Sequence, residues 1–152
     1  MSYEQLRFHE CGHATAFTLL GIPVLRVEMW GEWNGAGGHV IPARMHGLDK
    51  ALARDYMLAL LAAPMMADEP VPDWPLRRNA ATKDEVMLAV YAEYLGMDEH
   101  DYLQLRIEAW KFTCTDEFVR LFTGLSGLME RVPRINGDAV SAVAKLAEPK
   151  EC

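Results

Sequence analysis

The segment MSYEQLRFHECGHATAFTLLG at residues 1–21 constrains the fold more than any other part of the sequence. A capping pattern opens it, and a glycine and a proline follow its last apolar residue, so a helix is expected from Ser2 to about Leu20. Four residues advance an α-helix by about 400°, which puts His9 and His13 one turn apart on one face. The chain is therefore expected to present two imidazole rings side by side on a helix.

The remaining caps, apolar periodicities and breakers predict a mainly α-helical fold with a small N-terminal β-hairpin or sheet. Strands are expected at 24–30 and 39–43, joined by the glycine-rich stretch GEWNGAGG. Pro42 suits only an edge strand or a strand end. A proline-rich loop is expected at 64–79. Helices are expected at 48–63, at 82–95, over 98–131 with a break near 113–115, and from Asn136 to about Ala147.

Composition limits the classes of protein that this chain can belong to. A length of 152 residues with 51% hydrophobic content is enough for one domain, over 1–152. No apolar run approaches the roughly 18 residues of a membrane span, and the N-terminus lacks the pattern of a signal peptide. A net charge of −7 with scattered basic residues argues against nucleic-acid binding. Three widely spaced cysteines predict a reducing, cytoplasmic setting without a disulfide framework.

The HECGH motif has the residue types of a catalytic zinc site. His9 and His13 can bind one Zn²⁺ and leave room for a third ligand and a water molecule. Glu10 would lie beside the metal, where it can take a proton from the water and pass it to a leaving amine. Cys11 is expected to point away and be buried, and Gly12 indicates that another backbone packs close. The alternative is that both histidines simply line an amphipathic face.

Two histidines need a third ligand, and the residues alone leave its identity open. The extended metzincin pattern would need a histidine at position 19, where the chain has Leu19. The remaining histidines, His39, His46 and His100, are candidates, as are many carboxylates. Spacing does not choose among them.

The stretch FHECGHATAFTLLGIPVLRVEM resembles the start of the peptidase domain of the FtsH/paraplegin family, the AAA+ zinc proteases, whose motif reads HEAGHA. Further stretches resemble later family motifs in the same order, so the likeness covers nearly the whole chain. The HExGHA element is the specific part, and the later stretches carry weight only as a series. They are LLAAPMMADE for LLGGRAAEE, NAATKDEVMLAVYAEYLGM for GASNDLxxAT…MVxxyGM, and LMERVPRINGDAVSAVAKL for LLExExLdGdEI.

This resemblance implies a zinc metalloendopeptidase of the HExxH type, with Asp84 of the ATKDEV stretch as the third ligand. An aspartate in the first turn of a helix also simply favours the helix dipole, which is the other interpretation of Asp84. A polypeptide substrate is expected to lie extended along the edge strand and to add a strand by backbone hydrogen bonds. The expected substrate-binding residues are Gly38, His39, Val40 and Ile41.

The chain also departs from the family pattern. Ala62, Ala63 and Pro64 replace the glycine turn, and ATKD replaces SxND, so a polar Asn is lost. The sequence opens just before the HExxH helix and has no GxxxxGK[ST] loop, so the family's ATPase and transmembrane segments are expected to be absent. Either a separate AAA+ unfoldase acts with the chain, or the substrates are peptides and unfolded segments. The resemblance also raises the expectation of a homo-oligomer.

Two alternative functions fit the same residues. The chain could be a zinc-bound or metal-free protein-binding module that has lost turnover, although Glu10 argues against a pure scaffold. It could also be a dedicated regulatory protease that cuts one partner. Activity on a generic unfolded protein separates that last function from a general peptidase.

Overall fold

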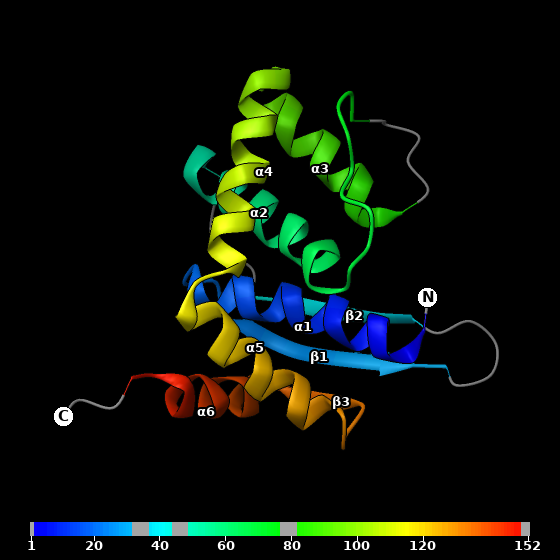
Figure 1. Cartoon of the computed structure of the whole chain (residues 1–152), viewed down its shortest axis with the longest axis vertical. Coiled ribbons are helices and arrows are strands. Elements are labelled where there is room, and N and C mark those ends of the chain that lie inside the picture. The colour runs from blue at the N-terminus through cyan, green and yellow to red at the C-terminus, as the bar shows by residue number, and fades with distance from the viewer. Residues whose placement is uncertain (1, 32–36, 44–48, 77–81, 150–152) are drawn as a thin grey trace.

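The computed structural model describes residues 2–31, 37–43, 49–76 and 82–149. As expected, the fold is mainly α-helical with a small antiparallel sheet (Figure 1). None of the helices in these ranges has the length and apolar character needed to cross a membrane. In chain order the elements are α1 (Tyr3–Leu19), β1 (Val24–Trp30), β2 (Gly37–Pro42), α2 (Lys50–Met66), α3 (Lys83–Tyr94), α4 (Glu99–Thr113), α5 (Asp116–Met129), β3 (Arg134–Asn136) and α6 (Gly137–Ala147).

The sheet has the strand order β2-β1-β3, with both pairings antiparallel. β2 starts at Gly37 rather than at residue 39, so Gly37 and Gly38 belong to the strand and not to the turn. Pro42 is the last residue of β2, and β2 pairs only with β1 in the described sheet, as an edge strand does. β3 was not expected, because three residues are too few to display an alternating pattern, and Asn136 also caps the next helix.

Each described helix begins where a side-chain oxygen accepts a hydrogen bond from the backbone N–H three residues later, which satisfies a donor that the helix itself cannot pair. The expected break within 98–131 is confirmed, since α4 ends at Thr113 and α5 begins at Asp116. The expected capping box at the start of α1 is also present. The capping residues are Ser2, Asp49, Thr82, Asp98, Thr115 and Asn136.

The expected end of α2 at residue 63 is wrong, because the helix continues through Pro64 to Met66. A proline removes one backbone hydrogen bond and usually ends or kinks a helix. Here it lies in the last turn and is itself buried. Met65 and Met66 then pack against the two hydrophobic clusters on either side of the helix, which compensates for the lost bond.

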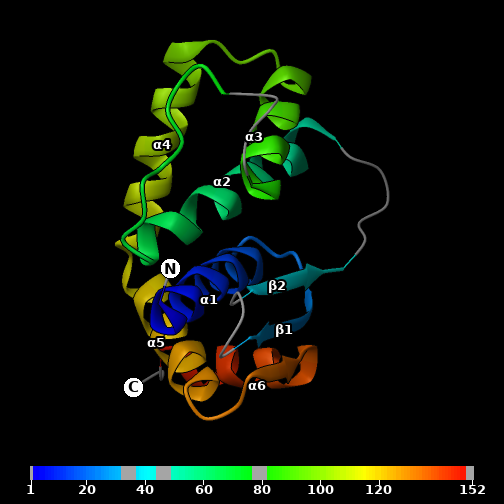
Figure 2. The same ribbon diagram turned by 90° about the vertical axis from the view of Figure 1, so that its right-hand side faces the viewer.

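The core consists of two hydrophobic clusters separated by α2. The sheet-side cluster joins α1, the three strands, α5 and α6, and includes Phe17, Val27 and Leu125. The helical cluster joins α2, α3 and α4, and includes Leu61 and Tyr102. Figure 2 shows α1 lying between the sheet and α2, with α3 and α4 on the far side of α2. A surface between α1 and α3 therefore belongs to neither cluster alone.

Gly12 brings α1 and α2 close together. A Cβ atom at this position would lie 3.0 Å from the Cα of Ala63 and 3.3 Å from the carbonyl oxygen of Ala62, so no larger residue fits without movement. This close backbone contact is the one that the glycine predicted. It also brings the carbonyl of Ala59, one turn earlier on α2, within reach of His13 on α1.

Candidate metal centre

Helix α1 presents His9 and His13 on one face, as their spacing predicts. Their rings meet edge to face with centroids 4.8 Å apart, and their Nε2 atoms are 3.2 Å apart. His13 is buried and His9 is partly buried. The Nε2 atoms of both rings therefore point to the same place, between α1, α2 and α3.

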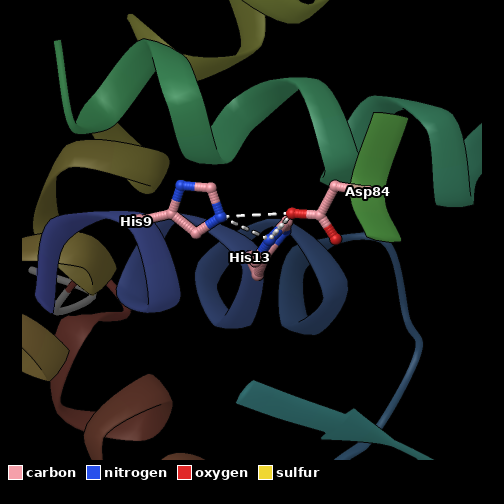
Figure 3. A group of neighbouring side chains, drawn as sticks. All are labelled: His9, His13 and Asp84. Carbon is pink, nitrogen blue, oxygen red and sulfur yellow. Dashed lines mark hydrogen bonds and ion pairs between the residues drawn. The ribbon is translucent and has the colours of Figure 1, made fainter. Parts of the chain in front are cut away.

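Asp84 in the first turn of α3 supplies an oxygen at the same place. Its Oδ2 atom lies 2.9 Å from Nε2 of His13 and 3.1 Å from Nε2 of His9 (Figure 3). These three residues form a potential metal-binding triad. Two ligand atoms at about 2.05 Å from a tetrahedral ion would be about 3.3 Å apart, so the triad needs only small shifts to hold one.

The hydrogen bonds of the two Nδ1 atoms determine that the Nε2 atoms of His9 and His13 carry the free lone pairs. Nδ1 of His13 donates to the carbonyl oxygen of Ala59 at 3.0 Å, and Nδ1 of His9 donates to the carboxylate of Glu69 at 3.2 Å. In a neutral histidine the Nε2 atom is then an acceptor. Three acceptors thus face one another within 3.2 Å, an arrangement that a cation between them stabilises.

The pKa values of His13 and Asp84 reflect the same demand for positive charge. Burial alone would lower the pKa of His13, but the hydrogen bond and the charge of Asp84 raise it. Burial would raise the pKa of Asp84, but its bonds to His13 and His9 hold that pKa well below its ordinary value. Without a cation between them, these shifts favour a protonated His13 paired with the Asp84 carboxylate, so a proton takes the place that a bound metal cation would take.

Glu10 lies beside the triad and is not a member of it. Its side chain is only 5% exposed, and burial raises the pKa of its carboxyl group above the ordinary value. A Cβ atom added at Gly38 would lie 3.1 Å from Oε1 of Glu10, so the Glu10 carboxylate lies against β2. Glu10 is therefore placed between the triad and the edge strand.

A cleft of about 400 Å³ opens at the triad between β2, α1, α2 and α3. A second hollow of about 210 Å³ adjoins it and shares His9, Glu10, Gly38 and Asp84 with it. The apolar wall of the first hollow consists of Phe17, Val40, Tyr56, Leu60, Met87 and Tyr91. Two residues of the triad, His9 and Asp84, thus line both hollows.

The expected substrate strand meets this cleft along most of its length. Gly38, His39, Val40 and Pro42 line the cleft, whereas Ile41 does not line it. Successive side chains of a strand point to opposite faces, so Gly38 and Val40 face the cleft and Ile41 faces away. Three of the four expected residues therefore line the cleft, and Ile41 is not among its lining residues.

Of the other histidines considered as third ligands, the two that the structure describes are not in the triad. His39 points to the outer face of the sheet, where it pairs with its cross-strand neighbour Glu28 and contacts the Trp30 ring. His100 on α4 lines a different groove, together with Trp110. His46 lies outside the described residues. The pairing with Glu28 turns the His39 side chain away from the triad, although His39 still lines the cleft.

Two supports of the histidines were not expected from the sequence. Glu69 follows the end of α2, and the Ala59 carbonyl comes from within that helix. A backbone carbonyl leaves no sequence signal. Glu69 does lie in the LLAAPMMADE stretch, but a carboxylate after a helix has many possible roles, and nothing in its spacing points to His9.

No model of a known protein family matches the chain, and a search of curated proteins finds no match either. The resemblance to the FtsH/paraplegin peptidase domain therefore stays a prediction, which depends on the motifs of the sequence. The functional argument depends on the geometry of the triad and its cleft.

Proposed function

We propose that the chain is a zinc-dependent metalloendopeptidase that cuts unfolded polypeptides or peptides. One observation carries this proposal: two histidine nitrogens and a carboxylate oxygen converge in a cleft that also holds a buried glutamate and β2, the edge strand of the described sheet. Each of these parts has a separate task in peptide hydrolysis. Their combination in one cleft favours that reaction over a purely structural metal site.

His9, His13 and Asp84 would hold the ion, and their donor set suits zinc. Two imidazoles and one carboxylate leave a ligand position open, as catalytic zinc sites do, whereas structural sites use four protein ligands. A bound Zn²⁺ would supply Lewis acidity, which lowers the pKa of a water ligand to about 7 and polarises a carbonyl group. Glu69 and the Ala59 carbonyl would keep both rings oriented for this task.

Glu10 would act as the general base and then as the general acid. Its carboxylate takes a proton from the attacking water and later gives it to the nitrogen of the leaving amine. Burial raises the pKa of Glu10, which brings it closer to the neutral range where such a group can both accept and release a proton. A binding module would have no need of a buried carboxylate at this position.

The edge of β2 would bind the substrate backbone. An extended peptide can add a strand to this edge, so that main-chain hydrogen bonds supply affinity with weak sequence preference. The apolar wall with Phe17, Tyr56 and Tyr91 favours an apolar side chain next to the cut bond. This substrate class agrees with the family resemblance, which also suggests a separate AAA+ unfoldase for folded substrates and a possible homo-oligomeric assembly.

The test combines metal analysis with proteolysis of casein, an unfolded substrate. Purified protein should hold about one zinc per chain and cut casein. Glu10→Gln should keep the zinc and lose roughly 10²–10⁴-fold in kcat. Glu4→Gln is the matched control, because Glu4 lies on the same helix but is exposed.

Other results would reject the proposal in distinct ways. Full activity of Glu10→Gln would remove the base from the mechanism. Zinc without cleavage of casein would indicate a dedicated protease or a binding module instead of a general peptidase. Protein that takes up no zinc when it is offered would refute the metal site itself.

A further inference from the structure

Gly38 is confined between the Glu10 side chain and the neighbouring strand. A Cβ atom at this position would lie 2.8 Å from Cγ of Glu10 and 3.0 Å from the carbonyl oxygen of Glu28 on β1. Carbon atoms in good contact are about 3.5–4.0 Å apart, so only a hydrogen atom fits here. The glycine is required by a close approach on two sides.

The position of Gly38 in the cleft makes this contact relevant to chemistry. Gly38 lines both hollows, at the place where they share His9, Glu10 and Asp84. It also belongs to the edge strand that would bind the substrate, and it pairs across the sheet with Met29. The contact between Gly38 and Glu10 therefore joins the strand directly to the buried carboxylate.

We propose that Gly38 is a positioning residue, whose missing side chain sets the place of the Glu10 carboxylate next to the triad. This inference depends on the proposed function, since it takes Glu10 as the base. With a methyl group at residue 38, either Glu10 or the strand must move by at least about 0.7 Å. The Glu28 carbonyl behind it resists movement of the strand, so the carboxylate moves.

A displacement of this size has a large effect on a proton-transfer group. A misplacement of about 1 Å can cost roughly 10²-fold in rate. The triad residues come from α1 and α3, and the three atoms nearest to a Cβ at residue 38 belong to Glu10 and Glu28 instead. Metal binding should therefore survive Gly38→Ala. The expected signature is a loss in kcat with the metal content and KM retained.

Gly37 provides a matched control on the same strand. A Cβ atom at Gly37 would meet the Trp30 ring at 2.8 Å, on the opposite face of the sheet from Glu10. Trp30 is half exposed and can turn toward solvent. Gly37→Ala thus makes the same chemical change in the same strand, without contact with the base.

The experiment compares Gly38→Ala, Gly37→Ala, Glu10→Ala and the double variant Gly38→Ala/Glu10→Ala. For each variant, zinc content, Tm, and kcat and KM on a peptide substrate are measured. We expect Gly38→Ala to lose about 10²-fold in kcat while zinc content stays unchanged and KM stays within about threefold. Gly37→Ala should keep kcat within about threefold.

The Tm values test the contact independently of catalysis. Gly38→Ala should lower Tm by several degrees in the native background and by much less in the Glu10→Ala background, where the opposing Cγ atom is gone. Equal losses in both backgrounds would overturn the inference, because the Glu28 carbonyl would then be the contact that matters. Native kcat in Gly38→Ala would overturn it as well.

Failure of the proposed function would look different. Native protein that cuts no substrate would refute the peptidase while the Tm comparison still decides the contact. Coupling between residues 38 and 10 would then support Gly38 as the residue that sets the Glu10 position, and its absence would reject that role.

Discussion

The two hydrophobic clusters hold their share of the candidate metal centre in different ways. In the sheet-side cluster, α1 packs against α2, α5, β1 and β2, and it carries His9 and His13. In the helical cluster, α3 packs mainly on α2, and it carries Asp84. Two ligands are thus fixed by contacts on several sides, and the third depends on one helix pair. An ion held by the triad would therefore link the two halves.

Loss of the α3 ligand should have the largest effect. Asp84→Ala removes the only carboxylate of the triad, so we expect zinc binding to be lost at micromolar free Zn²⁺. Equilibrium dialysis with metal analysis measures this directly. Glu85→Ala is the control, because it removes a neighbouring acid from the same first turn. Unchanged zinc binding in Asp84→Ala would mean that Asp84 only interacts favourably with the helix dipole of α3 and is not a metal ligand.

Zinc should stabilise the weaker half more than the stronger half. Free Zn²⁺ at a hundred times its Kd should raise the free energy of unfolding by about 2.7 kcal/mol. Hydrogen exchange should show the largest gain of protection at α3 and a small gain at α5 and α6. Equal gains everywhere would mean that the two halves already unfold as one unit, without need of the metal link.

Glu69 should tune the zinc affinity of the less buried histidine of the pair, His9. Glu69→Gln weakens the charged partner of His9 Nδ1, and loss of such a support typically costs 10–100-fold in metal affinity. Competition with a chelator of known affinity gives the zinc Kd. Asp68→Asn, the preceding residue, is the control. His13 has a backbone carbonyl as its support, so an unchanged Kd in Glu69→Gln would mean that the buried histidine alone decides affinity.

The smallest effect concerns Cys11 in the sheet-side cluster. Burial raises the pKa of this thiol to about 12 from 9.0. A raised pKa in the folded state means that its stabilisation is full below about pH 9 and is lost as pH rises toward about 12. The slope is at most about 1.4 kcal/mol per pH unit.

Urea unfolding at pH 8 and pH 10 measures this slope. Native protein should lose more stability between the two values than Cys11→Ala does, whereas the exposed Cys114→Ala should behave as native. If native protein and Cys11→Ala lose the same amount of stability between the two pH values, water reaches residue 11. The sheet-side cluster is then less rigid than its burial indicates.

The elements with local signals were predicted well from the sequence. Caps and breakers gave the helix starts, and the spacing of His9 and His13 placed both on one face. Asp84 could not be derived from spacing, since it is 71 residues away from His13, and only the family resemblance singled it out. The triad therefore combines one local and one long-range prediction.

The features that sequence reasoning missed depend on the tertiary structure. The continuation of α2 through Pro64 depends on packing by two methionines, which overrides a local breaker. β3 forms because β1 has a free edge that three residues can pair with. His39 appeared as a possible ligand because the face on which its side chain lies depends on the strand register, which the sequence does not give. The glycine-rich stretch also gave no signal for the residue at which β2 begins.

The strand order β2-β1-β3 has a consequence for the order of events during synthesis. The two histidines leave the ribosome among the first residues, but β1 gains its second partner only when Arg134–Asn136 have been made. The triad itself waits for Asp84. A nascent chain thus lacks the third residue of the triad until more than half of the protein has been made.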